Sequence, residues 1–163
     1  MVMPMFEPYH HAGSKEEAYK WMLKQFLSLT EGETNPIANL ANTAALLHHV
    51  LKDINWVGFY LREGEELVLG PFQGLPACVR IPLGKGVCGT AAVQKKTVRV
   101  DDVHQFPGHI ACDAASNSEI VVPIIKDGQL IGVLDIDSPL FRRFDETDEY
   151  YLEQLCAQLA NIL

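Results

Sequence analysis

Three of the four cysteines in this chain lie in small, turn-forming sequence that favours chemistry over packing. Cys78, Cys88 and Cys112 each have glycine, proline, alanine or serine nearby, and Cys112 stands in the polar segment 109–119. A thiolate in such a segment can attack an oxidised centre, and a thiol on another mobile segment can then reach the oxidised sulfur. The pattern predicts redox chemistry with Cys112 as the first candidate. The alternative for any one cysteine is a small buried hydrophobe.

Zinc binding is the main competing use of these thiols. Structural zinc sites usually supply cysteine ligands as closely spaced pairs, and no two of these cysteines form such a pair. We therefore expect neither a metal nor another cofactor. Cys156 falls in a helical pattern and is expected to be structural.

Three carboxylates follow Cys112 on what we predict to be two adjacent strands. Glu119, Asp135 and Asp137 can meet at one end of an antiparallel hairpin, where like charges raise one another's pKa. Ionised members of such a cluster could bind an ammonium group, and a protonated member could donate to an oxyanion or S=O oxygen. The sequence thus favours a small zwitterion bearing an oxidised group. The alternative is that these are solvated hairpin ends.

An aromatic face accompanies these charges on an earlier strand. Alternation along residues 54–61 places Trp56 and Tyr60 on one face of the sheet. They could line a ligand site, or they could only pack beneath a helix as core aromatics do.

Composition limits the classes of partner. With 13 Lys+Arg against 21 Asp+Glu, the formal charge of -8 argues against nucleic acid, whose phosphates need clustered positive charge. No apolar run approaches the roughly 20 residues of a spanning helix, and no signal segment begins the chain. We expect no membrane partner and a cytoplasmic protein, where thiols are normally reduced.

The elements that must position these residues form a helix–sheet–helix sequence. We expect an arm over 1–13 and one α+β domain over 14–163. Two strands joined by an Asp-Gly turn are expected at the centre of the sheet. The predicted helices span about 14–29, 35–52 and 145–162, with a short helix within 84–92, and the predicted strands cover 54–61, 67–69, 79–81, 97–100, 119–125 and 129–136.

Five short segments combine the cysteines with their aromatic and acidic companions. They are 55–60 (NWVGFY), 69–74 (LGPFQG), 86–89 (GVCG), 110–113 (IACD) and 132–137 (GVLDID). Together they resemble the family of free methionine-(R)-sulfoxide reductases, which have a GAF-type fold. The likeness extends over about residues 19–160 and is specific because it includes the cysteines with their companions.

The resemblance implies a fold, an activity and partners. It implies a six-stranded antiparallel sheet flanked by helices, a homodimer, and reduction of free methionine (R)-sulfoxide with electrons from thioredoxin. Cys112 would be the nucleophile and would become a sulfenic acid. Cys78 would resolve it as a disulfide, with Cys88 an alternative or secondary partner.

The same resemblance assigns the substrate contacts. Trp56 and Tyr60 would enclose the thioether methyl group. Backbone N–H groups could take the substrate carboxylate. The amino group and the sulfoxide would be held by Glu119, Asp135, Asp137 and Asp101.

A non-catalytic GAF sensor that binds a small ligand is the second hypothesis. It predicts an attached output domain, for which we expect no room at this length, and it leaves the three cysteines unexplained. Turnover of free methionine sulfoxide with a thiol reductant separates the two.

Overall fold

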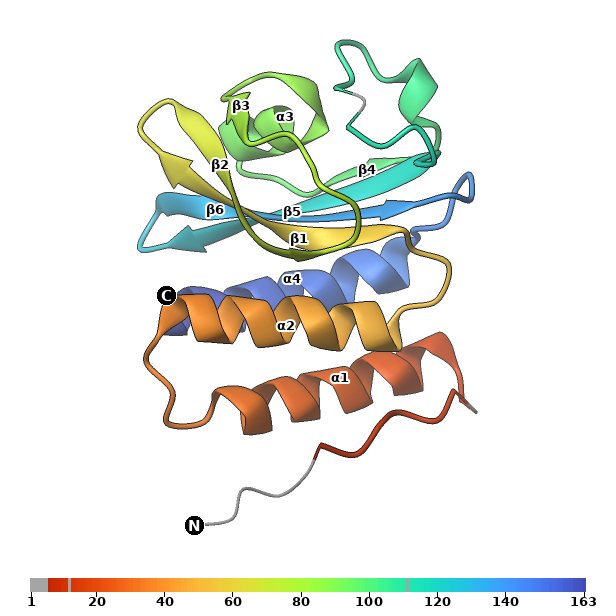
Figure 1. The fold of residues 1–163 in the computed structure, drawn as a ribbon, viewed down its shortest axis with the longest axis vertical. Helices are drawn as coiled ribbons and strands as arrows, with labels where there is room; N and C mark the ends of the chain where they lie inside the picture. The colour runs from red at the N-terminus through yellow and green to blue at the C-terminus, as the bar shows by residue number, and fades with distance from the viewer. Residues whose placement is uncertain (1–5, 12, 111) are drawn as a thin grey trace.

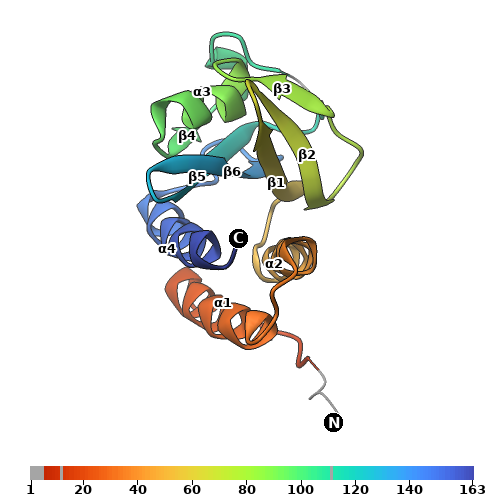
Figure 2. The ribbon, with the colours of Figure 1, turned by 90° about the vertical axis from the view of Figure 1, so that its left-hand side faces the viewer.

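The chain folds into stacked layers around one antiparallel sheet. A computed structural model describes residues 6–11, 13–110 and 112–163. Two helices cover one face of the sheet and a third lies beneath them, whereas a short helix and long connections cover the other face (Figures 1 and 2). This is the α+β architecture that the sequence predicted, and it gives the sheet two buried faces with different contents.

The sheet runs in the order β3-β2-β1-β6-β5-β4, with every neighbouring pair antiparallel. The six strands predicted from the sequence are all present, although β2 is longer than expected. Their bounds are β1 Trp56–Glu63, β2 Glu66–Gln73, β3 Arg80–Pro82, β4 Val98–Val100, β5 Ser118–Lys126 and β6 Gln129–Ser138.

The centre of the sheet differs from the expectation. The hairpin of β5 and β6 was predicted to be central, but the two middle strands are β1 and β6. β1 is buried over its first five residues and pairs on both sides, so it takes the position expected for β5. The predicted turn is present, because Asp127 and Gly128 both have positive φ, as a two-residue hairpin turn requires.

Three long helices begin at residues that cap them. Ser14 accepts from the Glu17 N–H before α1 (Lys15–Thr30), and Asn35 accepts from the Ala38 N–H before α2 (Pro36–Val50). Asp145 forms a capping box with Asp148 at the start of α4 (Glu146–Ile162). The fourth helix, α3 (Gly86–Gln94), lies on the opposite face of the sheet (Figure 1).

The two faces of the sheet form separate cores. Val57 and Phe59 of β1 point into a core shared with α1, α2 and α4. Trp56 and Tyr60 point the other way, into a smaller core shared with α3. No helix in the described ranges is long and apolar enough to span a bilayer.

Candidate active site

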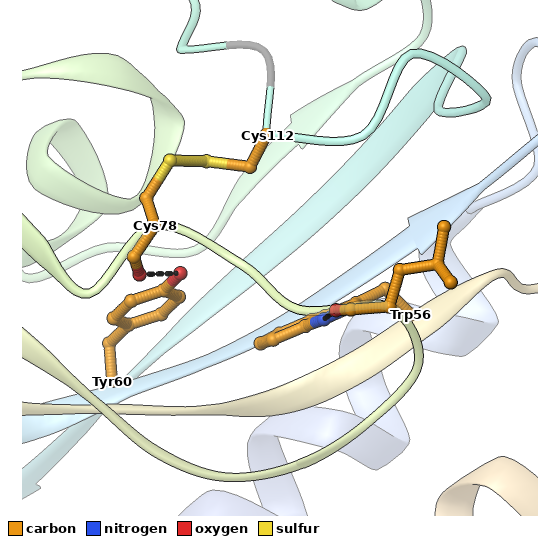
Figure 3. Close-up of a disulfide and its surroundings, with 5 residues drawn as sticks. Trp56, Tyr60, Cys78 and Cys112 are labelled. Atoms are coloured by element: carbon orange, nitrogen blue, oxygen red, sulfur yellow. Dashed lines mark hydrogen bonds between the residues drawn. A yellow bond between two sulfur atoms is a disulfide. The ribbon is translucent and has the colours of Figure 1, made fainter.

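A disulfide joins two connections on the α3 side of the sheet. Cys78 lies between β2 and β3, and Cys112 lies in the loop between the 3-10 turn η1 (Val103–Gln105) and β5. Their Cα atoms are 5.9 Å apart although 34 residues separate them in the chain (Figure 3). Cys112 is exposed and Cys78 is half-buried, so the bond is within reach of a reductant. The two thiols can therefore be oxidised and reduced as a pair.

The disulfide borders a cavity of about 50 Å³ that collects nearly all the predicted site residues. Aromatic and acidic side chains of the sheet line the cavity, together with the first turn of α3 and loop residues that include Cys112. The lining residues are Trp56, Tyr60, Leu75, Pro76, Ala77, Ile81, Lys85, Gly86, Val87, Cys88, His109, Ile110, Cys112, Asp113, Ser116, Glu119, Asp135 and Asp137.

One wall of the cavity is aromatic. Trp56 and Tyr60 stack with their ring centroids 6.0 Å apart, and both are almost fully buried. The Trp56 Nε1–H donates to the Leu75 carbonyl (3.0 Å), and the Tyr60 hydroxyl donates to the Cys78 carbonyl (2.8 Å). The apolar faces of the two rings remain to contact a ligand.

The acidic wall results from strand register. Glu119 of β5 pairs with Asp137 of β6, and Asp135 lies two residues earlier, on the same face. Burial, together with the neighbouring carboxylates, raises the pKa of Glu119 and of Asp135 well above the usual range. Burial raises the pKa of Asp137 to about 6, although its hydrogen bond with Glu119 opposes the shift. The shared hydrogen bond raises the pKa of Glu119 and lowers that of Asp137, so Glu119 is the donor when the pair carries one proton.

The floor of the cavity contains a cysteine and an unsatisfied acceptor. Burial raises the pKa of the Cys88 thiol, which hydrogen-bonds to Asp135. Asp135 is 6% exposed, and its Oδ1 has no hydrogen-bond partner among the described residues. Ligand atoms of Cys88, Glu119 and Asp135 lie within 4.8 Å of one another, so they could hold a cation, either a metal or an ammonium group.

The loop that carries Cys112 is held over the cavity at both ends. Asn55 Nδ2 donates to Asp113 (2.9 Å) and to Ser116 (3.0 Å). Gly86 has φ +62°, and a Cβ there would lie 3.2 Å from Ile110, so glycine lets this loop approach α3.

Several lining residues were not predicted as site residues. Asp113 and Ser116 lie in the segment around Cys112, and that segment was the signal that could have identified them. Lys85 directly precedes α3, in a glycine-containing turn. His109 lines the cavity, and its partial burial lowers its pKa.

Asp101 is the predicted site residue that the structure does not bring to the cavity. It is exposed after β4, and its backbone carbonyl accepts from the Arg142 N–H. β4 has only three residues and lies at the edge of the sheet, so the chain leaves the sheet before Asp101 can face the carboxylates. Its assignment to the substrate is not retained.

Comparisons with known proteins agree with this geometry. The GAF domain family matches residues 35–163. Free methionine-R-sulfoxide reductase of Escherichia coli is 59% identical over 92% of this chain and 91% of its own length, and that of Saccharomyces cerevisiae is 47% identical over 94% and 93%. The X-ray structure of free methionine-R-sulfoxide reductase from Neisseria meningitidis in complex with its substrate has a TM-score of 0.92 at 49% identity, covering 97% of this chain and 95% of that one.

Proposed function

This chain belongs to the GAF domain family, and we propose that it reduces free methionine-R-sulfoxide to methionine. The observation that carries the proposal is the Cys78–Cys112 disulfide at a cavity walled by two aromatic rings and three carboxylates. The carboxylates, the reactive cysteine and the aromatic rings each suit one part of the substrate.

The substrate's ammonium group is assigned to the carboxylates. Asp135 Oδ1 has no hydrogen-bond partner in the part of the chain that the structure describes, and Asp137, whose pKa is about 6, is the member of the cluster that ionises near neutral pH. An ammonium group donates three hydrogen bonds and carries the charge that this cluster lacks. The same requirement favours the free amino acid over a peptide, whose amide nitrogen is neutral.

The sulfoxide step is assigned to Cys112 and Glu119. The Cys112 thiolate attacks the sulfoxide sulfur. The sulfoxide oxygen is transferred to the Cys112 sulfur and takes up one proton, which gives a sulfenic acid, and methionine leaves. The proton that burial keeps on Glu119 makes this carboxyl suited to donate to the S=O oxygen. Trp56 and Tyr60 supply the apolar wall for the thioether methyl group.

Resolution is assigned to Cys78. Its thiol displaces water from the Cys112 sulfenic acid and forms the disulfide. The disulfide geometry supports this assignment, and burial disfavours the alternative resolver, because the high pKa of Cys88 keeps it a thiol facing Asp135. Cys88 is then part of the floor beneath the substrate.

A dithiol protein of the thioredoxin class is proposed to reduce the exposed disulfide and complete the cycle. This requires a compartment that keeps such dithiols reduced, so we assign the enzyme to the cytoplasm. We also propose a homodimer, to be measured by sedimentation equilibrium.

The testing experiment is turnover of free methionine sulfoxide with thioredoxin, thioredoxin reductase and NADPH. The proposal expects methionine to accumulate with one NADPH consumed per methionine, and only the R epimer at sulfur to disappear. A ligand-binding GAF sensor would bind the compound without forming methionine, and would leave the disulfide without a function. That outcome would overturn the proposal.

A further inference from the structure

The two aromatic residues of the cavity wall also hold the segment that carries Cys78. Trp56 and Tyr60 lie four residues apart on the same face of β1. Each donates one hydrogen bond to a backbone carbonyl of the connection between β2 and β3 (Figure 3). The acceptors are Leu75 and Cys78 itself. We propose that Tyr60 and Trp56 are positioning residues for the resolving step, because they hold Cys78 within reach of Cys112. This inference rests on the proposed function and adds a role for these side chains.

The segment has few other contacts with the sheet among the described residues. Leu75 is 63% exposed and Val79 is 60% exposed, while Ala77 packs against the core on the α3 side and the Val79 carbonyl accepts from the Leu69 N–H (2.9 Å). The two donors, in contrast, are rigid: Trp56 is 3% exposed and Tyr60 is 2% exposed. When the disulfide is reduced, hydrogen bonds from these buried donors remain as ties between the segment and the sheet.

The start of the segment is fitted to the indole ring. Gly74 has φ +141°, and a Cβ at this position would lie 2.5 Å from Trp56 Cδ1. The chain therefore passes directly against the ring before reaching Leu75, and only glycine permits that approach. Burial also raises the pKa of the Tyr60 hydroxyl, which stays a donor at every working pH.

The proposed role acts after methionine has left. The resolving reaction joins the Cys78 sulfur to the Cys112 sulfur, and the sulfenic oxygen leaves as water with the Cys78 proton. Its rate depends on how often the Cys78 sulfur occupies the position of attack. Loss of one of these hydrogen bonds lowers that occupancy, so its effect should appear in the step from the sulfenic acid to the disulfide.

The test separates these two steps in the Tyr60→Phe variant, which keeps the ring and removes only the donor. Reduced protein is mixed with excess methionine sulfoxide, and methionine release and disulfide formation are followed in quenched samples. Methionine release reports any change in the cavity wall that Tyr60 forms, and it is measured separately. The step from the Cys112 sulfenic acid to the disulfide should slow by roughly three- to tenfold, the range for one hydrogen bond. A 1,3-dione should trap more Cys112 sulfenic acid than in the unmodified protein.

The matched control is Tyr151→Phe, which removes a hydroxyl that donates to Glu16 on the helical side of the sheet. It should change neither step. Trp56→Phe removes the second donor and should also slow the step from the sulfenic acid to the disulfide, which provides an independent test should Tyr60→Phe fold poorly. An unchanged rate of this step in both variants would overturn the positioning role.

A second experiment, with hydrogen peroxide in place of methionine sulfoxide, tests the positioning role whether or not methionine sulfoxide is the substrate. Hydrogen peroxide oxidises the Cys112 thiolate to the sulfenic acid with release of water, so resolution can be timed without methionine sulfoxide. If the unmodified protein released no methionine, the proposed function would fail. Slower disulfide formation by Tyr60→Phe after peroxide would still support the positioning role, and an unchanged rate would contradict it.

Discussion

Buried carboxylates occur on both sides of the sheet, in opposite electrostatic settings. On the helical side, Asp148 is fully buried and accepts from the Tyr19 hydroxyl (2.6 Å), from Lys15 Nζ (2.8 Å) and from Arg143 Nη1 (3.3 Å). On the cavity side, Glu119, Asp135 and Asp137 have one another and a thiol, and no ion pair within the described ranges involves them.

The difference separates a structural use of charge from a functional one. Asp148 joins α1 and α4 with its charge balanced by cations of the protein, as buried charges usually are. The cavity carboxylates form no ion pair with a described side chain, so burial favours their protonated forms. Such a cluster costs stability until a cation arrives. This is the arrangement expected of a site that selects a substrate ammonium group.

Cysteine substitutions on the two sides should produce the largest contrast. Cys112→Ser should reduce turnover by at least about a thousandfold, because an alcohol is a far weaker nucleophile at neutral pH. The exposed position should leave the stability of the reduced protein nearly unchanged. Cys156→Ser, in the helical core, should lower stability while activity per folded molecule persists. Methionine assays and urea unfolding measure both, and near-normal turnover by Cys112→Ser would exclude it as the nucleophile.

Carboxylate substitutions should change stability in opposite directions. Asp148→Ala should destabilise by about 3 kcal/mol, because Lys15, Arg143 and the Tyr19 hydroxyl lose their partner. Asp137→Asn should stabilise the oxidised protein at pH 8 by about 1 to 2 kcal/mol after allowance for solvent screening. Urea unfolding of the disulfide form measures both.

The direction of the stability change expected for Asp137→Asn follows from the pKa of Asp137. Burial raises this pKa to about 6 in the folded protein, so folding favours the protonated carboxyl. That stabilisation is complete below the unfolded pKa, near 4, and is lost as the pH rises through 6. The benefit of Asp137→Asn should therefore appear at pH 8 and vanish near pH 4. Equal stabilisation by Asp137→Asn at pH 8 and at pH 4 would show that ionisation of Asp137 does not cause it.

Removing the ammonium charge from the substrate tests whether the cavity carboxylates recognise it. N-acetyl-methionine sulfoxide lacks the ammonium charge and leaves buried carboxylates without a partner. Its kcat/KM should be roughly a hundredfold below that of free methionine sulfoxide. Asp137→Ala or Glu119→Ala should narrow this gap, chiefly by impairing the free amino acid. Equal kcat/KM values in the unmodified enzyme would remove the case for ammonium recognition.

A smaller effect is expected in the pH dependence of binding. Calorimetry with Cys112→Ser, which binds without turnover, should show affinity for methionine sulfoxide rising up to about tenfold per pH unit below pH 6. The rise reflects ionisation of Asp137, whose pKa is about 6. The double variant that also contains Asp137→Asn should lose this rise in affinity with pH. If the rise persists in the double variant, the titrating group is not Asp137.

Most of the fold was predictable because local signals were strong. Ser14, Asn35 and Asp145 each cap the helix that the sequence placed after them, and the Asp-Gly turn forms as predicted. The central position of β1 was not predictable from its own residues, because strand order depends on which long-range pairs form. Within a single sequence, nothing distinguishes a β5–β1 neighbour from a β6–β1 neighbour.

The site was predictable where strand alternation determined it. Trp56 and Tyr60 are four residues apart, and Asp135 and Asp137 are two residues apart. Even spacing keeps side chains on one face of a strand, and the register between β1 and β6 places both pairs on the same face of the sheet. Asp101 was assigned from the family resemblance alone, and it does not line the cavity because the chain leaves the sheet at the end of β4. The hydrogen bonds from the aromatic side chains to the Cys78 segment depend on the path of a loop, so no pattern could have predicted them.

The most direct test of the central claim is a single turnover without any reductant. Fully reduced protein is mixed with excess free methionine-R-sulfoxide, methionine is counted, and the thiols are mapped by peptide mass spectrometry. Our account predicts one methionine per chain, the loss of two thiols, and a single new disulfide between Cys78 and Cys112, with Cys88 and Cys156 still reduced. Methionine release without loss of the Cys112 thiol, or no release at all, would contradict it.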